Sequence, residues 1–193
     1  NKIKDISSVI FTHEHADQTN GLFELRPFFW THNKKINAYG DLKAMNLIIK
    51  RHEYLFKKVS AYLPIIKSNI IKSKFSLGKD DEKIIFRAIK ASHGKTSSLI
   101  YIFEKTAYIS DCNDLSIIKA KELKNLRYLI IDCLRFKKHP SHFNLEESIY
   151  IHRHLKPQKT ILTNLHYSLD YNYLIKRLPE GVIPAYDGLK INL

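Results

Sequence analysis

The chain has 193 residues, of which 44% are hydrophobic, and a formal net charge of +13 from 32 lysines and arginines against 19 aspartates and glutamates. This length suits one domain, and the hydrophobic fraction is high enough to build a core. The two cysteines follow no paired pattern and exclude a disulfide scaffold. Without a signal peptide or a long apolar span, the simplest interpretation is a cytoplasmic protein with no membrane partner.

The positive charge favours phosphate-bearing substrates and is also compatible with nucleic acid. The lysines are spread along the chain among isoleucine and asparagine rather than clustered. A lysine-rich composition explains the charge equally well, so it indicates the class of partner only weakly.

The first chemical motif follows an apolar run near the start of the chain. Residues 9–11 predict a short buried strand, and the string THEHADQTNGL comes directly after it. His13, His15 and Asp17 alternate there, so a loop at a strand end can aim several of them at one point. Imidazole and carboxylate groups are suitable ligands for zinc, iron and manganese. A chance pair of solvated histidines is the alternative, which the complete T-H-x-H-x-D string argues against.

The next segment mixes helices and strands. Residues 21–26 are typical of the first turns of a helix that Pro27 limits. Residues 36–39 predict a strand, after which Asp41 is expected to cap a helix that runs to about residue 57. Residues 60–79 are expected to form a loop and an edge strand.

Extended patterns dominate from residue 83 onward. The predicted strands are residues 84–91, 98–103, 106–110, 126–132 and 160–164. Predicted helices cover residues 113–123, a segment before Pro157 capped by Asn144 or Ser141, and residues 171–178 capped by Asp170. A short strand pair is expected around Asp187 and Gly188.

Four polar residues lie at the ends of these elements. His93 and His166 each follow a strand, Asp111 follows another, and His142 precedes a helix by a few positions. Taken singly, the histidines could be ordinary loop or helix-start residues, and Asp111 could be an N-cap. Together with the first motif, they are candidates for one site.

The whole set of strings resembles the metallo-β-lactamase superfamily, whose metal motif reads H-x-H-x-D-H. THEHADQTNGL, SHG, SDC, DCLR with HPSHFNLEES, TNLHYSLDY and PAYDGL are together similar to the branch that contains phosphoribosyl 1,2-cyclic phosphate phosphodiesterase. Gln18 departs from the pattern, because most members have a fourth histidine there. The branch also has several N-terminal strands that this sequence lacks, so an N-terminally truncated chain is expected.

The resemblance implies an α/β fold, a metallo-β-lactamase-like αββα sandwich formed by residues 1–193 as one domain. It implies two divalent ions, zinc or manganese. His13, His15 and His93 would hold the first, Asp17 and His166 the second, and Asp111 would bridge them. A neutral amide is a poorer zinc ligand than imidazole, so Gln18 is expected to weaken the second site.

The implied reaction is hydrolysis of a small cyclic phosphodiester such as a phosphoribosyl cyclic phosphate. A water shared by the two ions would become the nucleophile, with Asp17 among the catalytic residues and His142 as proton donor to the leaving alkoxide. An RNA-processing nuclease of the same superfamily and a non-catalytic metal-binding fragment remain as alternatives. The expected partner is a small phosphodiester. Nucleic acid is less favoured because no long glycine- and lysine-rich insert separates the motifs. A homodimer remains an alternative to a monomer.

Overall fold

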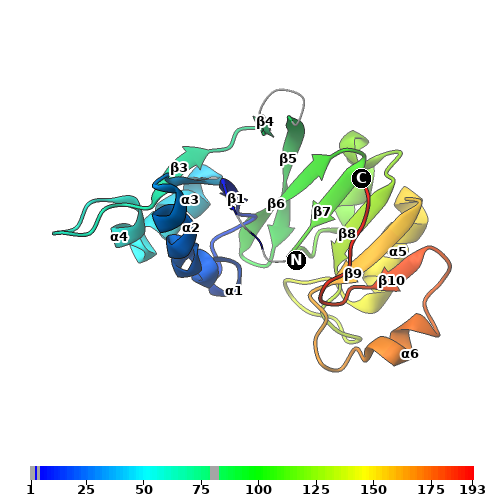
Figure 1. Cartoon of the computed structure of the whole chain (residues 1–193). Helices are drawn as coiled ribbons and strands as arrows, with labels where there is room; N and C mark the ends of the chain where they lie inside the picture. Colours follow the sequence, from blue (N-terminus) through cyan, green and yellow to red (C-terminus); the bar gives the residue numbers. More distant parts are fainter. Residues whose placement is uncertain (1–2, 4, 79–82) are drawn as a thin grey trace. The chain divides into compact units, whose positions relative to one another are not determined.

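The computed structural model describes residues 3, 5–78 and 83–193, and its contacts divide the chain into two compact units, Asn1–Leu77 and Gly78–Leu193. Figure 1 draws the first unit in blue to blue-green and the second in green to red. Each unit combines strands with helices and has its own hydrophobic core, which confirms the α/β prediction. No helix in the described part of the chain is long and apolar enough to cross a membrane.

The first unit is built around a three-stranded parallel sheet of order β1-β2-β3. Its elements are β1 (Ser8–Ile10), α1 (Ala16–Thr19), the 3-10 helix η1 (Asn20–Leu25), α2 (Arg26–His32), β2 (Ile36–Gly40), α3 (Leu42–Arg51), α4 (Glu53–Phe56), β3 (Ile66–Ile70) and β4 (Lys74–Leu77). Parallel strands have their carboxyl ends at one edge of a sheet. The loop after β1 therefore leaves the sheet at the same edge as the start of α3.

Two predictions for this unit are wrong in detail. Pro27 does not limit a helix but lies in the first turn of α2, where its missing N–H costs nothing and its fixed φ suits the helix. The helix capped by Asp41 ends at Arg51 rather than near residue 57, because His52 leaves the helical conformation with φ −123° and ψ 40°. The short α4 then carries Leu55 back into the core, beside Met45 of α3.

The second unit has the strand order β10-β9-β8-β7-β6-β5. Its elements are β5 (Ile84–His93), β6 (Thr96–Phe103), β7 (Thr106–Ile109), the 3-10 helices η3 (Leu115–Lys119) and η4 (Lys121–Leu123), β8 (Tyr128–Asp132), α5 (Leu145–Leu155), β9 (Lys159–Thr163), α6 (Tyr171–Ile175) and β10 (Val182–Pro184). β6 is antiparallel to both β5 and β7, and β7 to β10 are parallel. The carboxyl ends of β5, β7, β8, β9 and β10 therefore share one edge.

The hydrophobic core of this unit packs α5 and η3 against the strands that share this edge of the sheet. Ile151 of α5 and Ile117 of η3 pack with Ile109 of β7 and Ile131 of β8 in one buried cluster. The start of α5 is set by Asn144, whose side chain and that of Glu147 form the reciprocal capping box. Of the two predicted caps for this helix, Asn144 and Ser141, the structure confirms Asn144.

The remaining differences concern short segments of the second unit. Residues 113–123 form the 3-10 helices η3 and η4 instead of one helix, and Asp114 rather than Asp111 caps the first. The strand pair expected around Asp187 and Gly188 is wrong. β10 precedes these residues and pairs in parallel with β9, while Asp187 and Gly188 form a turn.

Candidate functional site

The motif of the first unit lies in the loop between β1 and α1. His13 is buried, whereas His15 and Asp17 are exposed. The rings of His13 and His15 meet edge to face with centroids 4.5 Å apart. The alternation seen in the sequence therefore does place two imidazoles together, and Asp17 follows in the first turn of α1.

Bonds from neighbouring residues hold this loop. Arg51 Nη1 donates to the carbonyl oxygen of Glu14 at 2.7 Å, and Thr12 Oγ1 lies 3.0 Å from His13 Nδ1. The Thr19 hydroxyl donates to the carbonyl oxygen of His15 at 3.0 Å. Because Arg51 ends α3, that helix fixes the position of the motif.

The second unit places His93 and Asp111 together at the shared strand edge. His93 ends β5, and its Nδ1–H donates to the carbonyl oxygen of Ser141 at 2.7 Å. In the neutral ring this leaves the lone pair on Nε2, which lies 3.5 Å from Asp111 Oδ2. An imidazole whose other nitrogen donates to a carbonyl is the usual arrangement of a metal-binding histidine.

His142 joins the same group through a second buried carboxylate. Its Nδ1–H donates to Asp132 Oδ2 at 2.8 Å, and its Nε2 lies 3.8 Å from Asp111 Oδ2. The Asp132 side chain is fully buried, whereas 16% of the His142 side chain is exposed. Asp132 thus orients a histidine whose side chain is partly exposed and whose other nitrogen faces Asp111.

Asn164 connects the two carboxylates. Its Nδ2 donates to Asp111 Oδ1 at 2.9 Å and to Asp132 Oδ1 at 3.2 Å. The Ser110 hydroxyl also donates to Asp111 Oδ1, and the backbone N–H of Cys112 donates to Asp132 Oδ2. These donors compensate for the removal of two carboxylates from water.

The loop before α5 is fixed to the end of β5. Asn113 accepts a hydrogen bond from the backbone N–H of Gly94 and donates to the carbonyl oxygen of Pro140. Gly94 has φ +57°, and a Cβ there would lie 2.9 Å from the Cβ of Ser141. Only glycine fits this approach without strain, and Ser141 in turn holds His93.

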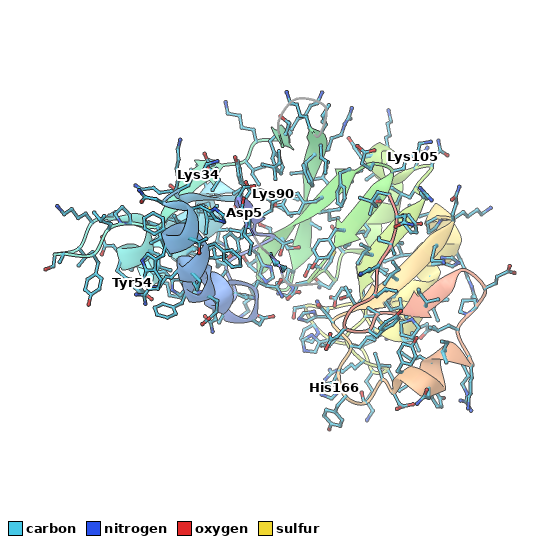
Figure 2. All side chains as sticks on the ribbon, in the orientation of Figure 1. Asp5, Lys34, Tyr54, Lys90, Lys105 and His166 are labelled. Carbon is cyan, nitrogen blue, oxygen red and sulfur yellow. The ribbon has the colours of Figure 1, made fainter. Side chains whose placement is uncertain are left out.

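His166 is exposed, unlike the buried His93 and Asp111. Figure 2 marks it on the exposed loop that follows β9, where its Nδ1 accepts a hydrogen bond from the backbone N–H of Ser168. Its backbone N–H donates to the carbonyl oxygen of Leu134. Its assignment to the second ion stays a prediction.

The two cysteines are buried next to the site but do not contribute reactive groups. Burial raises the pKa of the Cys112 thiol, and likewise that of Cys133, to about 12. Both therefore remain protonated near neutral pH, where only a thiolate would act as nucleophile or ligand.

Sequence reasoning selected His93, Asp111 and His142, which the second unit brings together, and missed Asp132 and Asn164. Asp132 ends a buried strand, and Asn164 comes directly after another. A polar residue at the carboxyl end of a buried parallel strand is the signal that could have identified both.

The chain belongs to the β-lactamase superfamily, because residues 1–167 match the family described as Beta-lactamase superfamily domain. A diphosphatase of the PhnP family superposes with a TM-score of 0.84 at 27% identity, covering 98% of this chain and 71% of that one. These findings confirm the resemblance and the metallo-β-lactamase-like fold. The superfamily is one of metal-dependent hydrolases, and the donors described above suit a divalent metal.

Two further solved structures share the fold at lower identity. The metallo-β-lactamase fold protein YhfI of Bacillus subtilis has a TM-score of 0.70 at 18% identity and covers 93% of this chain and 74% of its own. The short form of human tRNase Z has a TM-score of 0.67 at 16% identity, covering 97% of this chain and 79% of its own. At such identities they show the fold alone.

One curated relative extends beyond the matched region. It is an octanoyltransferase of Porphyromonas gingivalis (strain ATCC BAA-308 / W83), 28% identical over 192 residues. The match covers 97% of this chain but only 38% of that protein. This chain therefore spans less than half the length of the octanoyltransferase that it matches.

Proposed function

We propose that the chain is a metal-dependent phosphodiesterase that hydrolyses a small cyclic phosphodiester, such as a phosphoribosyl cyclic phosphate. The observation that supports this most is the buried group at the strand edge of the second unit. There Asp111 Oδ2 lies 3.5 Å from His93 Nε2 and 3.8 Å from His142 Nε2. The similarity to a diphosphatase of the PhnP family favours phosphorus chemistry within the superfamily.

The residues present fit a divalent ion such as zinc or manganese. In the second unit, His93 offers its Nε2 lone pair and Asp111 offers Oδ2, both on buried side chains. On the family motif, His13 and His15 would complete the ligands of the first ion, and Asp17 and His166 would serve the second. When bound, such ions supply a hydrolytic nucleophile from water and offset the charge that develops at phosphorus.

His142 would hold and deliver the proton that the leaving alkoxide needs. Its Nδ1–H is fixed by Asp132, so Nε2 is the nitrogen that exchanges a proton with substrate. The buried Asp132 carboxylate stabilises the imidazolium form that donates the proton. A general acid in this position typically accelerates such a step by about 10²–10⁴-fold.

The experiment that tests this function compares metal-free and metal-loaded protein on a panel of cyclic and linear phosphodiesters. We expect hydrolysis only with zinc or manganese added, and a reduction of more than about a hundredfold in Asp111→Asn. Asp114→Asn is the matched control, because the Asp114 side chain caps η3 by accepting a hydrogen bond from the backbone N–H of Ser116. Activity that is equal in metal-free protein, or unchanged in Asp111→Asn, would exclude the proposal.

An RNA-processing nuclease is the second candidate, and the net charge of +13 favours it. Binding to RNA through phosphate contacts weakens steeply as salt rises, since bound counterions are released. A steep salt dependence with a short RNA, absent for a small cyclic diester, would select the nuclease. Salt-independent turnover of the small substrate together with negligible RNA cleavage would select the phosphodiesterase.

A further inference from the structure

A groove of about 610 Å³ lies along the exposed face of α5 in the second unit. Leu145, Ile149 and Tyr150 of the helix line it, together with Phe136 of the loop that precedes the helix. Tyr150 is 42% exposed and Phe136 is 43% exposed. Large apolar side chains that gather in one exposed groove mark a site of interaction with another molecule. We call this surface the α5 groove.

Aromatic packing supports the wall that Phe136 forms. Its ring meets that of Tyr173 in α6 edge to face, with centroids 5.8 Å apart. The guanidinium of Arg177 lies 3.9 Å from the centroid of the Tyr173 ring. Edge-to-face and cation–π contacts are both favourable, so the wall is held by neighbouring side chains.

Two opposite charges line the same groove at the two ends of the helix. Glu146 lies in the first turn of α5 and Arg153 in the last, and both are exposed. Residues 146 and 153 are about 10.5 Å apart along the helix axis, whereas side chains that meet on a helix are three or four positions apart. Among the residues that the structure describes, neither side chain makes an ion pair or a hydrogen bond.

The order of these residues makes the helix face complementary to itself. Residues 146, 149, 150 and 153 fall within about 100° around the helix axis and therefore share one face. If two copies of α5 run antiparallel about a twofold axis between Ile149 and Tyr150, Glu146 of each copy faces Arg153 of the other. The apolar pair at the centre faces its own counterpart in the same way. Each contact then occurs twice, as in every isologous interface.

We propose that the α5 groove is the interface of a homodimer, in which α5 packs antiparallel against α5 of a second copy of the chain. Two ion pairs between Glu146 and Arg153 flank the apolar centre, and the exposed rings of Tyr150 and Phe136 leave the water. A second copy carries the matching order of charges by symmetry, which favours it as the occupant. The inference is independent of the proposed function, because the proposed catalytic residues do not line the groove.

Sedimentation velocity over a range of protein concentrations measures the dimer. About 0.15 M salt screens the repulsion between two chains of net charge +13 beyond about 8 Å and leaves pairs in contact largely intact. Glu146→Arg and Arg153→Glu each bring like charges together at both ends of the interface, and each should raise the dimer Kd by at least about tenfold. Glu122→Arg makes the same charge change on the exposed surface of η4, outside the groove, and should leave the Kd unchanged.

Mixing the two charge-reversed variants gives the sharper test. One variant carries arginine at both positions and the other carries glutamate at both, so an equimolar mixture restores opposite charges at each end. We expect a heterodimer that is at least about tenfold tighter than either variant alone.

Circular dichroism checks that each variant is folded, because both original charges also suit their ends of the helix dipole. Glu146→Gln and Arg153→Gln add no unfavourable charge to the helix, and each should also weaken the dimer. They replace a charge-reversed variant that does not fold. A chain that stays monomeric at all concentrations would overturn the proposal. So would a dimer that survives both charge reversals, or a mixture without a heterodimer, because either result places the interface elsewhere.

Discussion

The candidate residues of the two units are held in opposite ways. In the first unit they are neighbours along the chain, from the end of β1 to the first turn of α1, and His15 and Asp17 remain exposed. In the second unit they come from the ends of separate strands, and the Asp111 and Asp132 carboxylates are buried. The first arrangement depends on one stretch of chain and its bond to α3, whereas the second depends on the whole sheet.

This difference has an energetic consequence. A buried carboxylate is costly unless hydrogen bonds satisfy it, and removing one partner of such a network leaves a charge without compensation. Asn164, Ser110 and the Cys112 N–H supply those bonds in the second unit. Substitutions there should therefore have larger effects than comparable substitutions in the exposed loop of the first unit.

The largest effect is expected from His142→Ala. Loss of the proton donor should lower turnover of a substrate with a poor alkoxide leaving group by about 10²–10⁴-fold, with metal content unchanged. A nitrophenyl phosphodiester, whose leaving group needs little protonation, should be much less affected. Steady-state kinetics on both substrates, with metal analysis of each protein, measures this.

The control is a histidine of the same unit outside the site. His154 lies exposed on α5, with its Nδ1 donating to the carbonyl oxygen of Tyr150, so His154→Ala should leave both rates unchanged. Equal loss on both substrates in His142→Ala would instead indicate impaired binding or folding. Loss of metal would make His142 a ligand or a neighbour of one.

A smaller effect is expected from Asn164→Ala. Without the amide, Asp111 and Asp132 each lose a donor and are no longer joined. Residues that orient metal ligands typically contribute about 10–100-fold to metal affinity, so the variant should bind zinc more weakly by that order. Competition with a chelator measures the affinity. Asn172→Ala on the exposed side of α6 is the matched control, and identical affinities in the two variants would contradict the bridging role.

The strand-end geometry can also be disturbed through the backbone. Gly94→Ala forces a side chain into φ +57° and against Ser141, and should lower the free energy of unfolding by about 1–3 kcal/mol. Gly21→Ala in the first unit meets nothing within 4 Å and should be nearly neutral. Urea unfolding of both variants tests the pair. A neutral Gly94→Ala would mean that the loop before α5 moves aside readily.

Much of the fold was predictable because local signals agreed with the tertiary structure. The apolar run of β8 and the Asn144 cap of α5 are examples. Predictions failed where a local signal was ambiguous. The apolar pattern of α3 continues past His52 to Leu55, although the helix itself breaks, and a proline that ends one helix can equally begin another, as Pro27 does.

The residues of the candidate site also differ in how far they could be predicted from local sequence signals. His13 and His15 stand in one string, so their proximity could be predicted from sequence spacing. Asn164, by contrast, bonds carboxylates that are 53 and 32 residues away in sequence, and only the parallel register of β7, β8 and β9 brings them together. Whether the ligands of both units share one ion stays a prediction.

The smallest expected effect concerns the exposed loop itself. Gln18 Nε2 donates to Asp17 Oδ2 at 3.1 Å, so the amide occupies an oxygen that a second ion would otherwise use. Gln18→His removes this bond and adds an imidazole, and should tighten the second metal equivalent by up to about tenfold without changing the first. Titration of metal into stripped protein resolves the two equivalents. Asn20→His places an imidazole on the exposed surface two residues after Gln18 and should change neither. Two equally tight equivalents in the unmodified chain would show that Gln18 does not weaken the second site.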